Sequence, residues 1–289
     1  MTLIVESGAT KTDWLALAGD GTRVNVKTGG MNLASMPQDA VNEVVESASS
    51  LLFKEGVTKI DNIHFYAAGL ICQPGESVPV MAQTLDKVLR GFFPDASIEY
   101  ASDTLAAARA VCGHNPGIAA ILGTGSNSCL YDGERIVRNV RSGGFILGDE
   151  GGAARLGKLF ISDFIKGLVP EPVAGEFARD FEVDYLTVVR NVYKGEAPAG
   201  YLGSFAPWIT SRYDSCRYIK ELVDNNFRDF FERALKQYDI ESYPVGVVGG
   251  FGYANKDILM RLSEQFGIKF SKIIKAPIEG LVDYHSGRN

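Results

Sequence analysis

The chain has 289 residues, of which 46% are hydrophobic and 22% charged, and its formal net charge is −6 at pH 7. This length allows two domains with separate cores. The negative charge argues against a nucleic-acid or anionic-membrane partner, since both favour a basic surface. No apolar run could span a bilayer, and no basic segment of a secretory signal precedes the first apolar residues. The four cysteines form no C-x-x-C pair, so we expect free thiols and a cytoplasmic location.

The first thirty residues predict three strands with a loop of small residues after the first strand. Apolar runs at 2–5 and 14–18 form the first two strands, a turn at Asp20-Gly21 follows, and residues 23–27 form the third strand. The loop at 6–12 reads Glu-Ser-Gly-Ala-Thr-Lys-Thr. Such a loop can present backbone N–H groups and hydroxyls to phosphate oxygens.

The rest of the first half alternates helices with strands. The spacing of apolar residues predicts a helix over 38–55, a strand over 62–68, a helix around 81–92, a strand over 97–101 and an Ala-rich helix over 104–111. This order requires parallel strands with helices on the faces of the sheet. Ala67-Ala68-Gly69 and Ser102-Asp103 then lie at the carboxyl ends of strands, where ligands bind in such sheets.

The second half repeats the opening of the first. An apolar strand at 118–122 leads into Gly-Thr-Gly-Ser-Asn at 123–127, and strands over 128–131 and 135–140 follow, separated by an Asp-Gly turn. The repetition predicts a duplicated βββαβαβα domain, with one copy at 1–113 and the other at 114–289.

The second copy then departs from the first. A glycine-rich loop at 143–152 leads into a helix that starts at Ala153, and a helical insertion follows at about 156–238. The remaining elements are a strand that ends at Gly249-Gly250, a helix over 256–266, a strand over 272–275 and a closing helix over 278–284.

These elements resemble the acetate and sugar kinase/Hsp70/actin superfamily of nucleotide-binding proteins. The match spans essentially the whole chain, with a first phosphate loop at 6–12, a second at 122–126 and an adenosine motif at 247–252. Within it, the chain is similar to N-acetylglucosamine kinases of the BadF/BadG/BcrA/BcrD ATPase family. Gly-Thr-Gly-Ser-Asn, Gly-Asp-Glu-Gly and an aspartate that opens an Ala-rich helix carry this likeness. It implies an α/β fold of two ribonuclease H-like domains with ATP in the cleft between them.

The resemblance also implies roles for single residues. Asp103 matches the catalytic base, which accepts the proton of a sugar hydroxyl during phosphoryl transfer, although an aspartate at this place also fits a helix N-cap. Glu6 stands where most of the superfamily has an aspartate that helps to hold Mg²⁺, and its carboxylate still offers hard oxygen ligands. Sugar contacts are implied for Asn32, Gly148, Asp149 and Glu150. ATP contacts are implied for Gly8, Thr10, Lys11, Thr12, Gly123, Thr124, Gly125, Ser126, Gly249 and Gly250.

The implied function is ATP-dependent and Mg²⁺-dependent phosphorylation of an amino sugar, with N-acetylglucosamine at O6 as the first choice. Glucosamine, N-acetylmuramic acid and glucose stay open as acceptors. One alternative is a BadF-type activator ATPase, but such proteins bind an iron–sulfur cluster with closely placed cysteines. Another is a sugar- and ATP-binding protein with little turnover, because of Glu6. We expect small-molecule partners and no nucleic acid or membrane, and the aromatic-rich insertion could form a homodimer interface.

Overall fold

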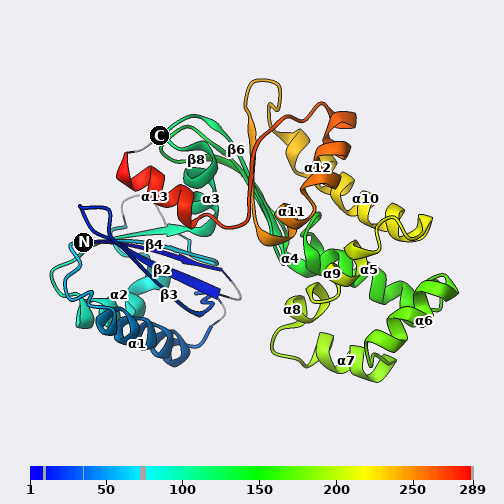
Figure 1. The fold of residues 1–289 in the computed structure, drawn as a ribbon, viewed down its shortest axis with the longest axis horizontal. Coiled ribbons are helices and arrows are strands. Elements are labelled where there is room, and N and C mark those ends of the chain that lie inside the picture. The colour runs from blue at the N-terminus through cyan, green and yellow to red at the C-terminus, as the bar shows by residue number, and fades with distance from the viewer. Residues whose placement is uncertain (9–10, 35, 72–75, 288–289) are drawn as a thin grey trace. The chain divides into compact units, whose positions relative to one another are not determined.

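The structure is a computed structural model that describes residues 1–8, 11–34, 36–71 and 76–287 (Figure 1). The chain forms two compact units. Unit 1 is Met1–His114 together with the C-terminal segment that begins at Pro277, and unit 2 is Asn115–Ala276. No helix in the described ranges is both long and apolar enough to cross a membrane.

Unit 1 is built on a five-stranded sheet with the strand order β3-β2-β1-β4-β5. The first three strands pair antiparallel, and β4 and β5 continue the sheet parallel to β1. This is the predicted topology of the first copy. The strands are β1 (Thr2–Ser7), β2 (Lys11–Leu17), β3 (Arg23–Gly29), β4 (Asn62–Ala67) and β5 (Ser97–Ser102).

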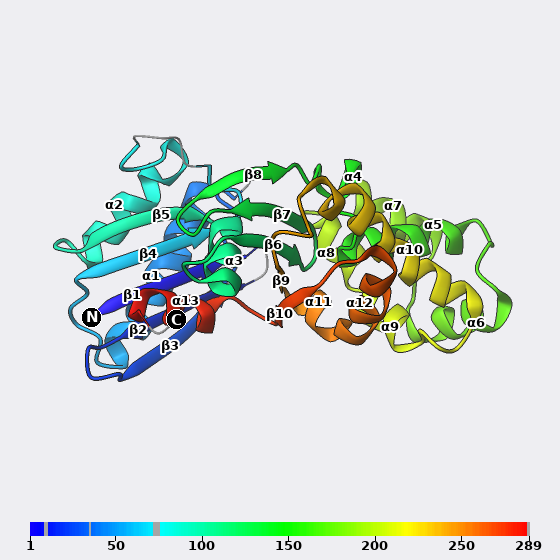
Figure 2. The same ribbon diagram turned by 90° about the horizontal axis from the view of Figure 1, so that it is seen from above.

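Helices cover both faces of the unit 1 sheet: α1 and α2 lie on one face, and α3 and α13 on the other (Figures 1 and 2). Leu3, Val5 and Trp14 belong to the core under α1 and α2. Since side chains alternate along a strand, Ile4 and Glu6 point to the opposite face. The helices are α1 (Gln38–Lys54), α2 (Gln83–Phe92) with a preceding 3₁₀ turn η1 (Val80–Ala82), α3 (Asp103–Cys112) and α13 (Ile278–Ser286).

Unit 2 has a sheet of the same design, with the strand order β10-β9-β6-β7-β8. Again the first three strands of the copy pair antiparallel, and β9 and β10 run parallel to β6. The predicted duplication is therefore confirmed at the level of strand order and direction. The strands are β6 (Gly117–Leu122), β7 (Ser126–Tyr131), β8 (Ile136–Val140), β9 (Val245–Val248) and β10 (Phe270–Ile274).

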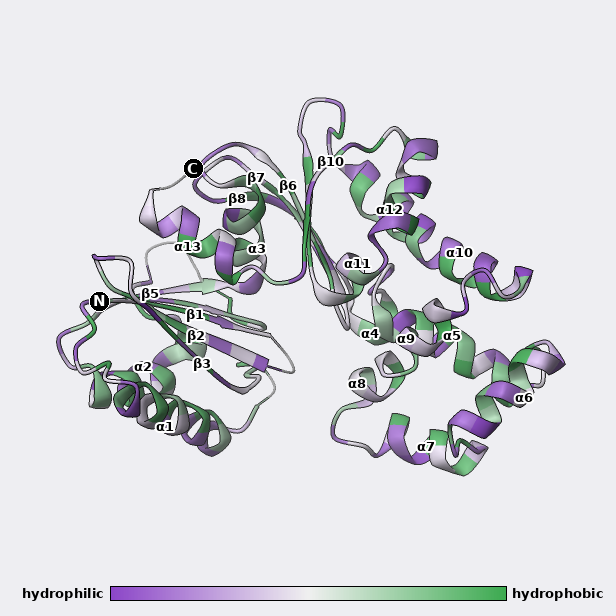
Figure 3. Cartoon of the chain, in the orientation of Figure 1, coloured by the Kyte–Doolittle hydropathy of each residue, from purple (hydrophilic) through white to green (hydrophobic). Residues whose placement is uncertain are grey.

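The predicted helical insertion is present, and α10 contributes its apolar stripe to a core rich in phenylalanine. Phe160, Phe177, Phe227 and Phe231 are fully buried there. Figure 3 shows green and purple alternating along α10, as expected of a helix with one buried face. The insertion comprises α5 (Ala153–Ile165), α6 (Glu171–Asp180), α7 (Tyr185–Tyr193), α8 (Pro198–Gly203), α9 (Ala206–Ser211), α10 (Arg217–Arg233) and η2 (Leu235–Gln237).

Two predicted loops contain short helices. The glycine-rich stretch before Asp149 includes α4 (Gly144–Leu147), and the glycine loop after β9 becomes α11 (Gly250–Ala254). A single helical turn needs no periodic apolar pattern, so apolar spacing does not predict these two helices. The remaining helical elements of unit 2 are α12 (Lys256–Ser263) and η3 (Glu264–Phe266).

The closing helix α13 departs from the predicted domain assignment, which placed it in the C-terminal copy. It packs on unit 1, where Arg23 pairs with Glu279 at 2.8 Å and Tyr66 Oη lies 2.8 Å from His285 Nε2. At the contact with α3, an added Cβ on Gly280 would lie only 2.4 Å from the Ala110 carbonyl oxygen. Chain order suggested the second domain, but this close packing groups the helix with the first.

Candidate functional site

The first phosphate loop is a narrow hairpin between β1 and β2. The Gly8 N–H donates to the Lys11 carbonyl at 3.0 Å. Thr12 is fully buried, and its hydroxyl lies 2.7 Å from Ser7 Oγ and donates to the Gly29 carbonyl at 2.8 Å. Thr12 thus ties three strands together below the loop. Its predicted ATP contact stays a prediction, as does that of Gly8, and Thr10 lies outside the described residues.

Glu6, the predicted metal ligand, lies on β1 and is only 9% exposed. Burial raises the pKa of Glu6 to about 7; Lys11 lowers this pKa, while the negative charges of Asp13 and Asp103 raise it. The carboxylate therefore lies close to other acidic groups and exchanges its proton near neutral pH. A cation bound here would stabilise the ionised form.

Asp13 is a charged residue of this site that the sequence interpretation missed. Its side chain is 3% exposed, Lys11 Nζ lies 2.8 Å from Asp13 Oδ2, and Lys27 Nζ lies 3.4 Å from Asp13 Oδ1. In the sheet, Asp13 stands directly opposite Glu6 on one side and Lys27 on the other. Asp13 could have been noticed because aspartate is depleted in strands, so an aspartate within a predicted strand is unusual.

Asp103, the predicted base, begins α3 at the carboxyl end of β5 without capping the helix. The N-cap is Ser102, whose hydroxyl accepts a hydrogen bond from the Leu105 N–H at 3.2 Å. Asp103 Oδ1 accepts one from the Thr104 hydroxyl at 3.2 Å. Burial raises the pKa of Asp103, against the lowering effect of Thr104. The N-cap alternative is thereby removed, and the carboxylate is a stronger proton acceptor than an exposed aspartate.

Asn32 lies at the same edge of the unit 1 sheet. It forms a parallel bridge with Ala68, just beyond the end of β4, and the Leu33 N–H donates to the Ala68 carbonyl at 3.2 Å. Asn32 Oδ1 accepts from the Ala34 N–H at 3.0 Å, and its side-chain NH₂ group donates to no other described residue, so it could donate to a ligand. The carboxyl ends of β4 and β5, at Ala68 and Ser102-Asp103, therefore lie at one edge of the sheet, together with Asn32.

The second phosphate loop lies against the beginning of α5 in unit 2. The N–H groups of Ala153 and Ala154 donate to the carbonyls of Gly123 and Thr124 at 3.0 and 2.8 Å. The loop itself is closed by a 3.0 Å bond from the Gly123 N–H to the Gly125 carbonyl. The start of α5 therefore fixes the conformation of this loop.

Asp149, a predicted sugar ligand, contacts this loop directly. Its Oδ1 accepts from the Ser126 N–H at 3.2 Å, and a Cβ on Gly125 would lie 2.7 Å from Oδ2, so a side chain at position 125 would displace this carboxylate. Burial raises the pKa of Asp149, the Ser126 N–H lowers it, the charge of Glu150 raises it, and Lys158 lowers it. Asp149 also has the left-handed φ of 56°, which few non-glycine residues adopt. Its backbone is thus held in an unusual form that turns the carboxylate toward the loop.

Gly148 and Glu150 flank this aspartate and have structural partners within unit 2. The Gly148 N–H donates to the Gly144 carbonyl at 2.8 Å. Glu150 Oε1 lies 3.1 Å from Arg233 Nε and 3.6 Å from Arg155 Nη1, as charge pairs without ideal hydrogen-bond geometry. Glu150 is therefore engaged by arginines, and its predicted role toward a sugar stays a prediction.

The glycine motif after β9 meets the strand that precedes the second phosphate loop. Gly249 has a φ of 135°, and a Cβ there would lie 2.3 Å from the Leu122 carbonyl oxygen. Its N–H donates to the Ile274 carbonyl at 3.0 Å, and Gly250 then begins α11. The second phosphate loop and the predicted adenosine motif are thus neighbours at one edge of the unit 2 sheet.

Lys158 on α5 is a second residue that the sequence interpretation missed. Its Nζ donates to the carbonyls of Phe145 and Ile146 at 2.6 and 3.3 Å. Burial and the charge of Arg155 lower the pKa of Lys158, whereas Asp149 and Glu150 raise it. The sequence pattern did not identify Lys158 as a site residue, because the carbonyl groups to which it donates lie in a separate loop.

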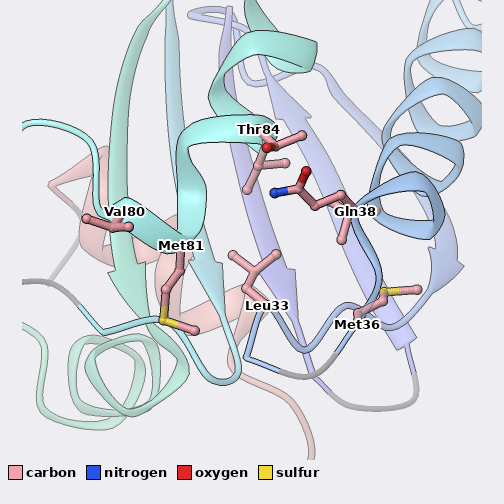
Figure 4. Close-up of a pocket in the computed structure, with 8 residues that line it drawn as sticks. Leu33, Met36, Gln38, Val80, Met81 and Thr84 are labelled. Carbon is pink, nitrogen blue, oxygen red and sulfur yellow. The ribbon is translucent and has the colours of Figure 1, made fainter.

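A cavity of about 220 Å³ opens beside the loop that carries Asn32 (Figure 4). It lies between the start of α1 and η1, and Gln38 and Thr84 are its polar lining residues. None of the described residues that line it is charged. The apolar lining residues are Leu33, Met36, Val41, Val80, Met81 and Leu85.

Comparisons with known proteins agree with this architecture. A scan against models of protein families and a search of curated proteins found no match. Among solved structures, a putative N-acetylglucosamine kinase from Porphyromonas gingivalis matches with a TM-score of 0.90 and 34% identity over 99% of each chain. A second such protein, from Chromobacterium violaceum, has a TM-score of 0.76 and 20% identity over 96% of each chain. A putative N-acetylmannosamine kinase from Listeria monocytogenes has a TM-score of 0.52 and 14% identity over 100% of this chain and 99% of its own.

The two sheets of one topology, with glycine-rich loops at their carboxyl ends, define the fold shared by sugar kinases and actin-like ATPases. The lower-identity matches show this fold alone. The Porphyromonas gingivalis protein is 34% identical over nearly the whole chain, so the chain belongs to its family, that of the N-acetylglucosamine kinase-like proteins. The resemblance read from the sequence motifs is therefore confirmed.

Proposed function

We propose that this protein transfers the γ-phosphoryl group of ATP to the O6 hydroxyl of N-acetylglucosamine. Its class, an ATP-dependent sugar kinase, follows from its family. The observation that carries the acceptor chemistry is Asp103, a carboxylate at the end of β5 that does not serve as the cap of its helix. N-Acetylglucosamine is the acceptor named for the family member with 34% identity, and O6 is its primary hydroxyl.

Asp103 acts in this proposal as the general base. A base must reach the hydroxyl proton and must hold it more strongly than an ordinary aspartate. Burial raises the pKa of Asp103 and so moves its basicity in that direction. Phosphoryl transfer requires little other protein chemistry, and positioning with charge stabilisation accounts for most of the rate.

Each unit supplies one phosphate loop for the proposed ATP contacts. In unit 1, Lys11 adds a positive charge beside the backbone of the hairpin. In unit 2, the loop at 123–126 is neutral, and Gly249-Gly250 stand next to it at the sheet edge, where no side chain obstructs a nucleotide. Backbone N–H groups in such loops bind phosphate oxygens.

Glu6 is the residue that would hold Mg²⁺. Across the described ranges, no group of three or more His, Cys, Asp or Glu side chains could hold a metal alone. A single buried carboxylate still fits Mg²⁺, which commonly takes one or two carboxylates, waters and the phosphates of its substrate. Burial raises the pKa of Glu6 to about 7, and a cation bound beside the carboxylate would stabilise its ionised form. When bound, the ion would neutralise charge that develops on the phosphates.

For the sugar, the proposal assigns Asn32 as a donor and Asp149 as an acceptor. Asn32 keeps its NH₂ group available while its oxygen is held by the Ala34 N–H. Asp149 uses Oδ1 for the Ser126 N–H, so Oδ2 is the oxygen that can accept from a hydroxyl. Gly148 and Glu150 would support Asp149 by fixing its backbone rather than by touching the sugar.

A homodimer formed through the helical insertion is part of the proposal. Tyr185, Leu186 and Tyr193 of α7 are 63%, 74% and 79% exposed, an unusual density of large apolar side chains on a surface. Light scattering of the wild type and of Leu186→Glu would test this interface. A monomeric wild type would contradict it.

The function is tested by ADP release from Mg-ATP with N-acetylglucosamine, N-acetylmuramic acid, glucosamine, N-acetylmannosamine, glucose or no sugar. We expect the highest kcat/KM with N-acetylglucosamine and a product phosphorylated at O6 by NMR. Asp103→Asn should abolish this turnover, and Asp61→Asn, an exposed aspartate of the same unit, should not. ADP release that ignores every sugar would overturn the proposal, and iron content after anaerobic purification would then test the activator ATPase.

A further inference from the structure

Two lysines share one buried carboxylate beside the first phosphate loop. The side chain of Asp13 is 3% exposed, whereas those of Lys11 and Lys27 are 52% and 66% exposed. Lys11 Nζ lies 2.8 Å from Oδ2, and Lys27 Nζ lies 3.4 Å from Oδ1. Each oxygen of the carboxylate therefore has its own cation, and both cations reach it with flexible, partly solvated side chains.

Strand geometry brings these groups together. Lys11 and Asp13 are two positions apart on β2, so their side chains lie on the same face of the sheet. Lys27 on β3 stands directly opposite Asp13, where cross-strand side chains are in contact distance. Glu6 stands opposite Asp13 on the other side. The row across β1, β2 and β3 therefore holds two carboxylates, Glu6 and Asp13, and one lysine, Lys27.

Asp13 therefore has two cationic partners, one at each oxygen of its carboxylate. A buried carboxylate that loses its only partner is strongly destabilised, so a single lysine could not leave it easily. With two lysines, one can leave while the other keeps the carboxylate paired. Lys11 is the one that can reach a ligand, because its residue closes the hairpin loop through the 3.0 Å bond from the Gly8 N–H.

We propose that Lys27 is a positioning residue for ATP: by keeping Asp13 paired, it allows Lys11 to exchange that carboxylate for the phosphates of the nucleotide. This inference rests on the proposed function, since it requires Lys11 to contact the triphosphate. The ammonium group of a lysine suits such an exchange, because it is a point charge on a long flexible stem. Lys27 itself does not touch the nucleotide in this scheme.

The test measures Mg-ATP binding by titration calorimetry together with kcat and both KM values, for Lys27→Met, Asp13→Asn and the double variant. We expect Lys27→Met to weaken ATP binding about five- to tenfold, between the effects of exposed and buried ion pairs. Values of kcat and of the sugar KM should change by less than about twofold, since the base and the sugar contacts are untouched. The double variant should bind ATP as Asp13→Asn does. Lys59→Met, which removes a 78% exposed lysine paired with Asp61, is the matched control.

Two results would overturn the inference. If Lys27→Met binds ATP as tightly as the wild type, Lys27 has no role in ATP binding. If the double variant binds ATP as weakly as Lys27→Met, Lys27 contacts the phosphates directly. Should Asp13→Asn fail to fold, Lys27→Arg provides the second arm: it keeps the charge and should bind ATP like the wild type, and tenfold weaker binding would contradict the scheme. A wild type that binds no ATP would instead refute the proposed function.

Discussion

In each unit, one of the buried carboxylates near the phosphate loop has two cationic partners, but the partners differ in kind. In unit 1, Asp13 is paired with two partly exposed lysines. In unit 2, Glu150 lies between Arg233 and Arg155, and Arg155 also donates to Asp229 Oδ2 at 2.7 Å. Among the described residues, Lys11 and Lys27 form no second ion pair, whereas Arg155 pairs with both Glu150 and Asp229.

The kind of cation decides whether a buried carboxylate can exchange its partner for a ligand. An ammonium group on a flexible stem can change partners, whereas a guanidinium group held by two carboxylates stays in place. The charges of unit 1 are therefore available to a ligand. The arginines of unit 2 hold Glu150, and with it the neighbouring Asp149. Asp149 accepts a hydrogen bond from the Ser126 N–H and so preserves the shape of the neutral loop at 123–126.

The largest effect should follow from Glu150→Gln. Neutralising this side chain leaves two arginines near each other without their shared carboxylate, and we expect a loss of about 2–4 kcal/mol in the free energy of unfolding. Urea unfolding of the variant measures it, with Glu232→Gln on the exposed side of α10 as the control. The ATP affinity of the folded variant should stay near that of the wild type. A loss below about 0.5 kcal/mol, the range of ordinary surface substitutions, would remove the contrast between the units.

The activity should depend on the ionisation of Glu6. Because its pKa is raised to about 7, kcat/KM for Mg-ATP should rise as the pH increases through 7, when the carboxylate loses its proton. Lys11→Met removes the charge that lowers this pKa, so the rise should move to higher pH. Glu6→Gln should have low activity without this rise. If the rise occurs at the same pH in Lys11→Met as in the wild type, Lys11 does not lower the pKa of Glu6.

Acid should destabilise unit 1 before unit 2, since all three histidines lie in unit 1. Burial, with the charges of His64 and Arg109, lowers the pKa of His285 to about 3 from 6.5. The folded state therefore binds fewer protons, and the stability present above pH 6.5 is lost as the pH falls below it. Glu99, whose pKa is lowered from 4.5 to about 2, adds to the loss only below pH 4.5.

Thermal melting at pH 7.5, 6.0 and 5.0, followed by the fluorescence of Trp14 in unit 1 and Trp208 in unit 2, would measure this. We expect the midpoint reported by single-tryptophan variants that keep Trp14 to fall across this window, and His285→Gln to flatten the fall. If the melting midpoint reported by Trp208 falls as much as that reported by Trp14, the acid-sensitive group is not confined to unit 1.

The smallest effect should come from Arg233→Ala. The side chain of Arg233 is 61% exposed, and Arg155 remains beside Glu150 when it is removed. We therefore expect a loss of less than about 1 kcal/mol, as for exposed ion pairs. The same urea unfolding measures it. A loss equal to that of Glu150→Gln would show that Arg155 contributes nothing to the pair.

Much of the fold could be predicted because apolar periodicity is strong in the central elements. The runs at 2–5 and 118–122 are buried strands, and the spacing of apolar residues over 38–55 corresponds to α1 within one residue. The helix α13 was also located, but not its packing partner. Periodicity reports which side of a helix is buried and not which element covers it.

The candidate site was predicted less completely, for a related reason. The motifs located Glu6 and Asp103, but the charged neighbours that change the pKa of Glu6 come from β2 and α3. Asp13 was passed over because its partner Lys27 is distant in sequence and adjacent only through the register of β2 and β3. Ser102, rather than Asp103, proved to be the helix cap, which the two adjacent residue types alone did not decide.

The sequence by itself determined the duplicated βββαβαβα order, the two glycine-rich loops and the positions of the chemically active residues along the chain. These features depend on local patterns of polarity and on residue types that turns require. Only the tertiary structure decided which charges meet: Asp13 with two lysines, Glu150 with two arginines, and Asp149 with the Ser126 N–H. Electrostatic interactions depend on distance and burial in space, and neither is encoded by position along the chain.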